Sequence, residues 1–161
     1  METFHTILVT MFLGVLPISE LRGAIPFAYF NGIPLFLASL IGGGANLLVY
    51  PFAMVFLTYL HDYFYSHFSW YISLFDKTVN KTRHKLSEKV ALYGLLGITL
   101  FVAIPLPITG AYTGTLGAWV LGLNRKKSFF AVSLGVLIST LIVSLILLIG
   151  DASFSLFIKK I

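Results

Sequence analysis

The sequence contains no cysteine and few charged residues. Without cysteine the chain has no disulfide framework, no cysteine-based zinc site and no thiol nucleophile. Asp, Glu, Lys and Arg make up 11% of its 161 residues, well below the roughly 25% that is usual in soluble domains. This composition excludes a disordered chain and a nucleic-acid-binding domain built on charge, and it is not that of a soluble enzyme.

Common catalytic and metal-binding patterns are also missing. The sequence has no HExxH motif and no recognisable Ser/His/Asp triad. His61, Asp62 and His67 are irregularly spaced in an aromatic segment that suits a membrane interface, so we expect no metal site there. We expect no enzymatic activity, no nucleic-acid partner and no cofactor, apart from a coupling proton or a bound Na⁺.

Hydrophobic residues account for 58% of the chain. Four stretches contain no Asp, Glu, Lys or Arg at all: 3–19, 23–61, 90–124 and 128–150. A bilayer core about 30 Å thick needs about 20 residues of apolar helix. Residues 33–60 and 128–150 therefore each predict one transmembrane span.

The other two stretches are interrupted. Stretch 3–19 is too short to cross the bilayer easily and is followed by Glu20 and Arg22. Stretch 90–124 contains Pro105 and Pro107. Two prolines so close together do not fit a regular helix interior, because each removes a donor and clashes with an earlier carbonyl. We therefore predict two re-entrant hairpins, 3–32 and 90–123, each made of two half-helices around broken backbone.

Together these elements predict an all-α integral membrane protein in a single membrane domain, 1–161. The first repeat, 1–60, and the second, 90–150, each join one hairpin to one span. Leu16-Pro17-Ile18 recurs 90 residues later as Leu106-Pro107-Ile108. Each repeat crosses the membrane an odd number of times, so the two repeats have opposite orientations, as in inverted-repeat transporters.

Positive charge predicts the orientation. Eight Lys and Arg residues fall in the connector 61–89 or in the loop 124–127, whereas the tail 151–161 holds only two. The positive-inside rule therefore predicts a protein of the cytoplasmic (inner) membrane with the connector on the cytoplasmic side and both termini on the outer side. The basic charges of the connector either set this topology or also bind anionic lipid. We expect membrane lipids and a second copy of the chain, as a homodimer, to be its partners.

Two segments resemble a known family. ELRGAIP at 20–26 and FVAIPLPITGAYTG at 101–114 are similar to the two signature segments of the prokaryotic small multi-drug export protein family. That family is identified as a remote relative of the DedA/VTT proteins. Those proteins have paired re-entrant hairpins and are implicated in lipid transport, so the resemblance implies both features for this chain. The acidic residue that DedA proteins place beside the second hairpin's prolines is replaced here by nearby Thr109 and Thr113.

Glu20 and Arg22 are the first candidate site. An ionisable residue at membrane depth costs about 2.5–3.5 kcal/mol or more and usually marks a functional position. Residues i and i+2 face apart on a helix, so we predict an extended break in which both lie on one face. They would form a proton or ion acceptor beside an anion clamp. Alternatively, both lie at the interface and only stabilise the turn.

Further candidates lie at the two breaks and in the first span. Thr109 and Thr113 are predicted ligands, unless they serve only hairpin geometry. Asn46 lies mid-span, where it either lines the site or bonds two helices. The residues predicted to shape the hairpin breaks are Gly23, Pro26, Pro105, Pro107, Gly110 and Gly114.

The function that these patterns favour is ion-coupled transport with H⁺ or Na⁺. The predicted substrate is a lipid phosphate or another anionic amphipathic compound. Two alternatives remain open, an exporter of small amphipathic compounds and a membrane scaffold that transports nothing.

Overall fold

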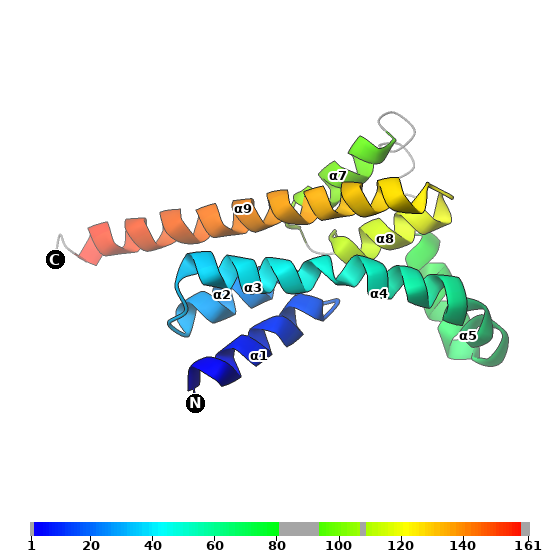
Figure 1. The fold of residues 1–161 in the computed structure, drawn as a ribbon, viewed down its shortest axis with the longest axis horizontal. Helices are drawn as coiled ribbons and strands as arrows, with labels where there is room; N and C mark the ends of the chain where they lie inside the picture. The colour runs from blue at the N-terminus through cyan, green and yellow to red at the C-terminus, as the bar shows by residue number, and fades with distance from the viewer. Residues whose placement is uncertain (1, 81–93, 107–108, 159–161) are drawn as a thin grey trace. The chain divides into compact units, whose positions relative to one another are not determined.

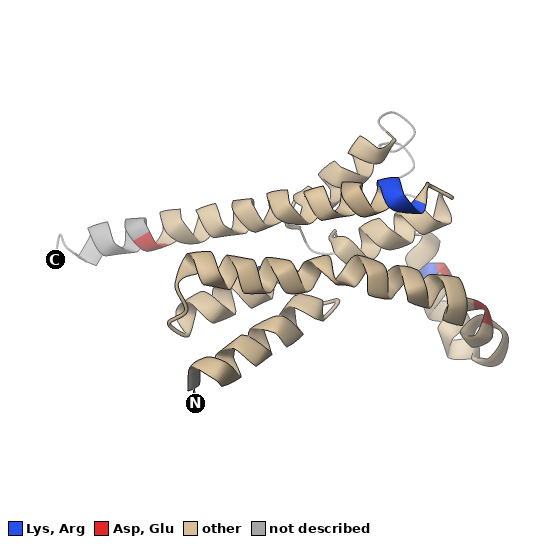
Figure 2. Cartoon of the chain, in the orientation of Figure 1, with Lys and Arg blue, Asp and Glu red and all other residues tan. Residues whose placement is uncertain are grey.

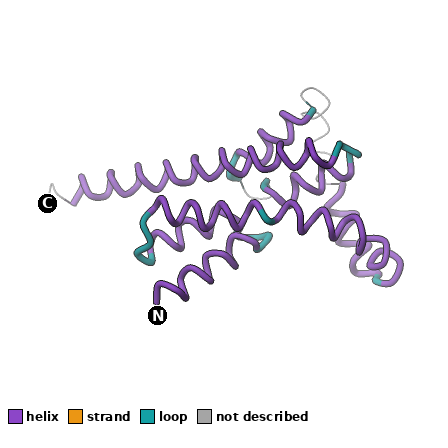
Figure 3. Tube along the Cα trace, in the orientation of Figure 1, coloured by secondary structure: helices purple, strands orange, loops and turns teal. Residues whose placement is uncertain are grey.

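The computed structural model describes residues 2–80, 94–106 and 109–158. Within these ranges every regular element is a helix and no strand occurs (Figure 3), which confirms the predicted all-α class. Two helical segments, Leu35–His67 and Arg125–Asp151, are long and apolar enough to cross a membrane. The first covers the predicted span 33–60 from residue 35 onward, and the second contains the predicted span 128–150. The helices carry few charges along their length (Figure 2).

Contacts divide the chain into two compact units (Figure 1). The first comprises Met1–Asn46 with Leu137–Ile161, and the second comprises Leu47–Val136. Each unit contains one pair of short helices and part of each long helix.

In the first unit, α1 (Glu2–Val15) and α2 (Glu20–Phe30) flank a short turn. The helix stops before Pro17, as expected because the residue preceding a proline disfavours the α region. The break is shorter than predicted, since Gly23 and Pro26 lie inside α2 and not in the break. A proline at the seventh residue of α2 removes one helical donor without ending the helix.

The first span consists of several consecutive helical segments. They are α3 (Leu35–Leu47), α4 (Val49–Val55), the π-helix η1 (Phe56–Leu60) and α5 (His61–His67). Pro51 lies in the first turn of α4, where its missing N–H costs little. The helical path extends beyond the predicted end at residue 60, and a further helix covers residues 69–80.

Small residues bring the helices of the first unit together. A Cβ atom placed on Gly14 would lie 2.9 Å from the Ala45 Cβ, and one on Gly42 would lie 2.9 Å from the Ile25 side chain. The α1–α2 pair therefore packs closely on α3. The Ser39 and Ser144 hydroxyls lie 2.7 Å apart, which joins α3 to α9 (Arg125–Ile158). Such small-residue contacts are typical of helix packing in membranes.

The second unit repeats this pattern with α7 (Leu95–Ala103) and α8 (Ala111–Val120). The Thr99 hydroxyl donates to the Ala131 carbonyl of α9 at 3.1 Å. A Cβ atom on Gly135 of α9 would lie 2.6 Å from the Val102 Cβ. The α7–α8 pair is thus held against the beginning of α9 by close backbone approach.

The second helix of each pair ends in the same way. In both ends a glycine with positive φ, Gly32 at 84° or Gly122 at 64°, follows the helix. Two backbone bonds then run back to the last turn, in the Schellman pattern. They are Ile33 N–H to Ala28 (3.1 Å), Gly32 N–H to Tyr29 (3.1 Å), Leu123 N–H to Ala118 (2.9 Å) and Gly122 N–H to Trp119 (3.0 Å). The two sets of bonds are 90 residues apart.

Candidate functional site

Glu20 is a buried acid in an unusual backbone conformation. It is the first residue of α2, and its exposed fraction is 3%. Its φ of 49° is the one positive value at a non-glycine residue in the described part of the chain. The left-handed region costs an L-residue roughly 1–2 kcal/mol, and such strain is concentrated at functional sites. Gly110, 90 residues later, has a φ of 155° and directly precedes α8.

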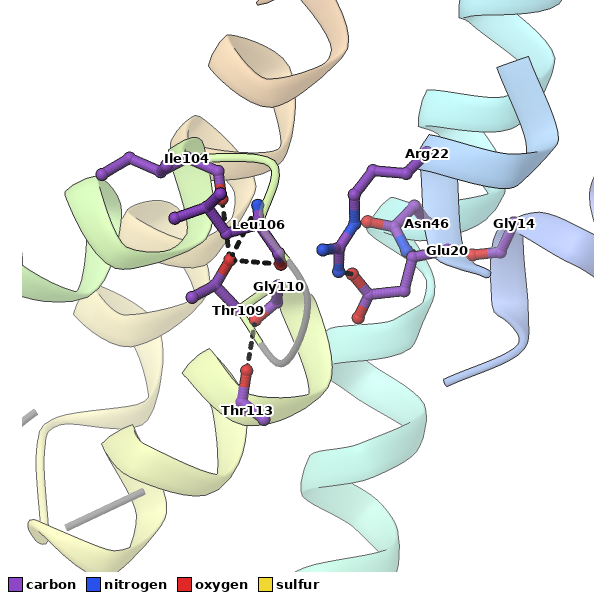
Figure 4. Close-up of polar contacts among 9 residues, drawn as sticks. All are labelled: Gly14, Glu20, Arg22, Asn46, Ile104, Leu106, Thr109, Gly110 and Thr113. Atoms are coloured by element: carbon purple, nitrogen blue, oxygen red, sulfur yellow. Dashed lines mark hydrogen bonds and ion pairs between the residues drawn. The ribbon is translucent and has the colours of Figure 1, made fainter. Parts of the chain in front are cut away.

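Arg22 pairs with Glu20. Its Nη2 atom lies 3.0 Å from Glu20 Oε2, and the two side chains are 21% and 5% exposed (Figure 4). We predicted this contact from an extended segment, but Arg22 lies inside α2. The pair forms because the left-handed turn at Glu20 starts the helix, so its side chain does not follow ordinary helical spacing. A guanidinium donates through a planar fork, which suits carboxylates and phosphates.

Asn46 contacts the other side of the same break. Its exposed fraction is 1%, and its Nδ2 donates to the Gly14 carbonyl at 2.9 Å (Figure 4). That carbonyl lies in the last turn of α1, whose carbonyls have no intrahelical donor. Asn46 therefore joins two helices, which was one of the two predicted roles. The amide caps the half-helix just before the break, and Glu20 begins the half-helix just after it.

The amide oxygen of Asn46 is the distinctive feature of this region. Asn46 Oδ1 is buried and has no hydrogen-bond partner in the structure. Leaving a buried acceptor unsatisfied costs about 1–3 kcal/mol, so such an atom in a native fold calls for a ligand or a mechanistic reason. Carboxylate and amide oxygens are the ligand types that hard cations accept. Glu20 and Asn46 thus supply two buried oxygen ligand types near the first break.

At the second break, the predicted ligand Thr109 forms hydrogen bonds with the backbone of the loop. The Thr109 hydroxyl lies 2.8 Å from the Ile104 carbonyl and 2.7 Å from the Leu106 carbonyl, and the Leu106 N–H donates to it at 3.2 Å (Figure 4). Thr113 donates to the Gly110 carbonyl at 3.3 Å. Both hydroxyls thus have backbone partners within the hairpin.

Two further residues predicted to shape this hairpin are Pro105 and Pro107. Pro105 lies in the loop between α7 and α8, whereas Pro107 falls outside the described residues. A Cβ atom on Gly114 would collide with the Val102 side chain, so this glycine allows α7 and α8 to touch. Glu20, Arg22 and Asn46 belong to the first unit, and Thr109 and Thr113 belong to the second.

Sequence reasoning missed two features. The first is Gly14, whose carbonyl binds Asn46 and which no motif marks. The second is a cavity of about 570 Å³ in the second unit, bounded by α4, η1, residues 69–80 and α8. Thr113 is the predicted site residue that lines this cavity. His61, weighed as a metal ligand, lies among aromatic rings, with its centroid 4.2 Å from that of Phe75. No cluster of three or more possible metal ligands occurs in the described ranges.

Comparison with protein families gives one match for this chain. The model of the family described as "Putative small multi-drug export protein" matches residues 20–142. The matched range begins at Glu20, directly after the first break, and includes the second break. Searches of curated proteins and of solved structures gave no significant match.

Proposed function

The chain belongs to the small multi-drug export protein family, a family of membrane proteins, and from this premise we propose that it is an ion-coupled transporter. The coupling ion is H⁺ or Na⁺, and its site is at the first break. The observation that carries this proposal is Glu20, a buried acid with a strained backbone at the break, in the same unit as the unsatisfied amide oxygen of Asn46.

The proposed architecture is two repeats, each with one re-entrant hairpin and one span. It is supported by the matching helix ends at Gly32 and Gly122. Leu35 begins α3 and Arg125 begins α9, again 90 residues apart. A common local geometry at one constant offset is the expected result of an internal duplication. With one span in each repeat, the repeats are inverted in the cytoplasmic membrane.

The proposed mechanism uses the exchange of partners by Glu20. In one state the carboxylate pairs with Arg22, as in this structure. In the other state Glu20 holds the coupling proton or ion, and Arg22 is released. The free guanidinium then binds the anionic group of an amphipathic substrate, such as a lipid phosphate, through two parallel hydrogen bonds. Coupling follows because Arg22 serves only one anion at a time.

A flux assay with a defined lipid tests this proposal. A polyprenyl phosphate with a fluorescent label is reconstituted with the protein in liposomes, and its movement between leaflets is followed by chemical quenching from outside. We expect an imposed H⁺ or Na⁺ gradient to bias the movement. Arg22→Lys keeps the charge but loses the planar fork, so it should slow the phosphate lipid at least tenfold. Equal rates with and without either gradient would contradict the coupling.

A further inference from the structure

The second unit contains a cavity whose walls come from three helical segments. Its volume is about 570 Å³, within the range of roughly 300–1,000 Å³ that is typical of sites for small molecules. Phe52, Ala53 and Phe56 line it from the first span, Leu74 and Phe75 from residues 69–80, and Thr113 from α8. All these residues lie in one compact unit.

The lining is aromatic and uncharged. Phe52, Phe56, Tyr71, Phe75 and Tyr112 contribute five rings, and no Asp, Glu, Lys or Arg is present. The few polar groups are hydroxyls. The Tyr71 hydroxyl lies 3.1 Å from His61 Nδ1, and burial raises the pKa of Tyr71, so the phenol stays neutral. The cavity therefore offers ring faces and no charge to a ligand.

Contacts behind the lining hold these rings in place. Tyr71 stacks on Phe75, with centroids 5.5 Å apart and an interplanar angle of 24°. Phe56 meets Tyr71 edge-on at 6.2 Å, and Trp119 meets Phe75 edge-on at 6.2 Å. A wall of braced rings binds a flat ring with little loss of side-chain freedom, and each aromatic pair contributes beyond the area it buries.

The backbone beside the cavity supplies an independent argument. Phe56 and Leu57, which both line the cavity, begin the π-helix η1. Segments of π-helix are rare and are often found at functional sites. Here the wider turn lies in the middle of a long helical path, where an α-helix would be the default.

We propose that this cavity is a binding site for an uncharged aromatic compound or for the uncharged aromatic part of a larger one. Ring faces attract a cation, but no carboxylate in the lining offsets the cost of desolvating its charge. Asp76, the acid on the same helix, accepts a hydrogen bond from Tyr65 at 3.2 Å and does not line the cavity. A flexible acyl chain gains nothing from ring stacking and loses more conformational freedom on binding. This inference goes beyond the proposed function and does not rest on it, because the anionic group of the proposed substrate binds at Arg22 in the first unit.

Binding of a neutral fluorescent ring compound tests the inference directly. N-phenyl-1-naphthylamine is titrated into lipid nanodiscs that contain the full chain, and signal from empty nanodiscs is subtracted. Ala53→Phe fills the cavity and should weaken binding at least tenfold. Val55→Phe adds the same ring on the same helix at an exposed position outside the lining, so binding should stay within twofold. If Ala53→Phe does not fold, Thr113→Leu on the opposite wall should give the same loss.

Competition and a second variant separate the possible outcomes. Unlabelled naphthalene derivatives without charge should displace the probe, whereas tetraphenylphosphonium and dodecane should not. Equal probe affinity in Ala53→Phe, or preferential displacement by either of those two compounds, would overturn the inference. Glu20→Gln should bind the probe as the unmodified chain does. Probe binding without ion-driven flux would contradict the proposed transport alone, and flux without probe binding would contradict the cavity assignment alone.

Discussion

Tyr29 donates a hydrogen bond of 3.0 Å to Asp151 Oδ2, across 122 positions of the chain. Tyr29 lies near the end of α2, and Asp151 ends the apolar part of α9. Both groups are exposed. Within the first unit, the end of α2 and the end of the apolar part of α9 therefore lie next to each other. This contact fits the proposed topology, in which both ends are at the outer surface.

The topology predicts which surface positions can be labelled from each side. Because the chain has no cysteine, single cysteines can be introduced at Asn31, Lys77 and Lys126, all of which are exposed. We expect the cysteine at 31 to react with an impermeant maleimide from outside whole cells. Those at 77 and 126 should react only after the membrane is opened, because most Lys and Arg residues flank them. Labelling of 77 and 126 from opposite faces would remove the second re-entrant hairpin.

Two substitutions at Glu20 separate backbone strain from charge. Glu20→Gly and Glu20→Ala both remove the carboxylate and its pair with Arg22. Glycine adopts a φ of 49° without strain, whereas alanine does not. We expect the glycine variant to be about 1 kcal/mol more stable than the alanine variant. Thermal unfolding in one detergent measures this difference, and equal stability of the two variants would show that the left-handed turn is not retained.

Adjacent glycines in α3 offer a matched test of helix packing. A Cβ atom on Gly43 would lie 2.7 Å from the Thr140 hydroxyl of α9, whereas one on Gly44 would meet nothing within 4 Å. Gly43→Ala should destabilise the protein by about 1–3 kcal/mol through overpacking. Gly44→Ala should leave stability unchanged or raise it by up to about 1 kcal/mol, because alanine favours helix. Unfolding temperatures of the two variants decide the point, and a stable Gly43→Ala would exclude this helix contact.

Much of this fold was predictable because charge and proline are strong signals in an apolar chain. The charge-free stretches marked both long helices, and Pro17 and Pro105 lie beside the two breaks that the structure contains. Glu20 stood out as a buried ionisable residue by its sequence context alone, and its burial is confirmed. Local sequence was sufficient for these features.

Other features depend on contacts between distant residues. The bond from Asn46 to Gly14 spans 32 positions, and nothing in either local sequence indicates its partner. The conformation of Glu20 was unpredictable, because glutamate rarely adopts positive φ. The aromatic cavity combines residues from three segments. The sequence of each segment alone predicts only an ordinary apolar helix or an interfacial segment. Tertiary packing, and not periodicity, creates these features.

The most direct test of ion coupling at Glu20 is proton or Na⁺ movement in liposomes that contain Glu20→Gln. Glutamine preserves the size of the side chain but cannot exchange a proton. Internal pH and Na⁺ dyes report ion flux after a polyprenyl phosphate is added, and Asp62→Asn, an exposed acid, is the matched control. We predict lipid-dependent flux of one ion in the unmodified chain and in Asp62→Asn, and at most a few per cent of it in Glu20→Gln. Full flux in Glu20→Gln would contradict the account.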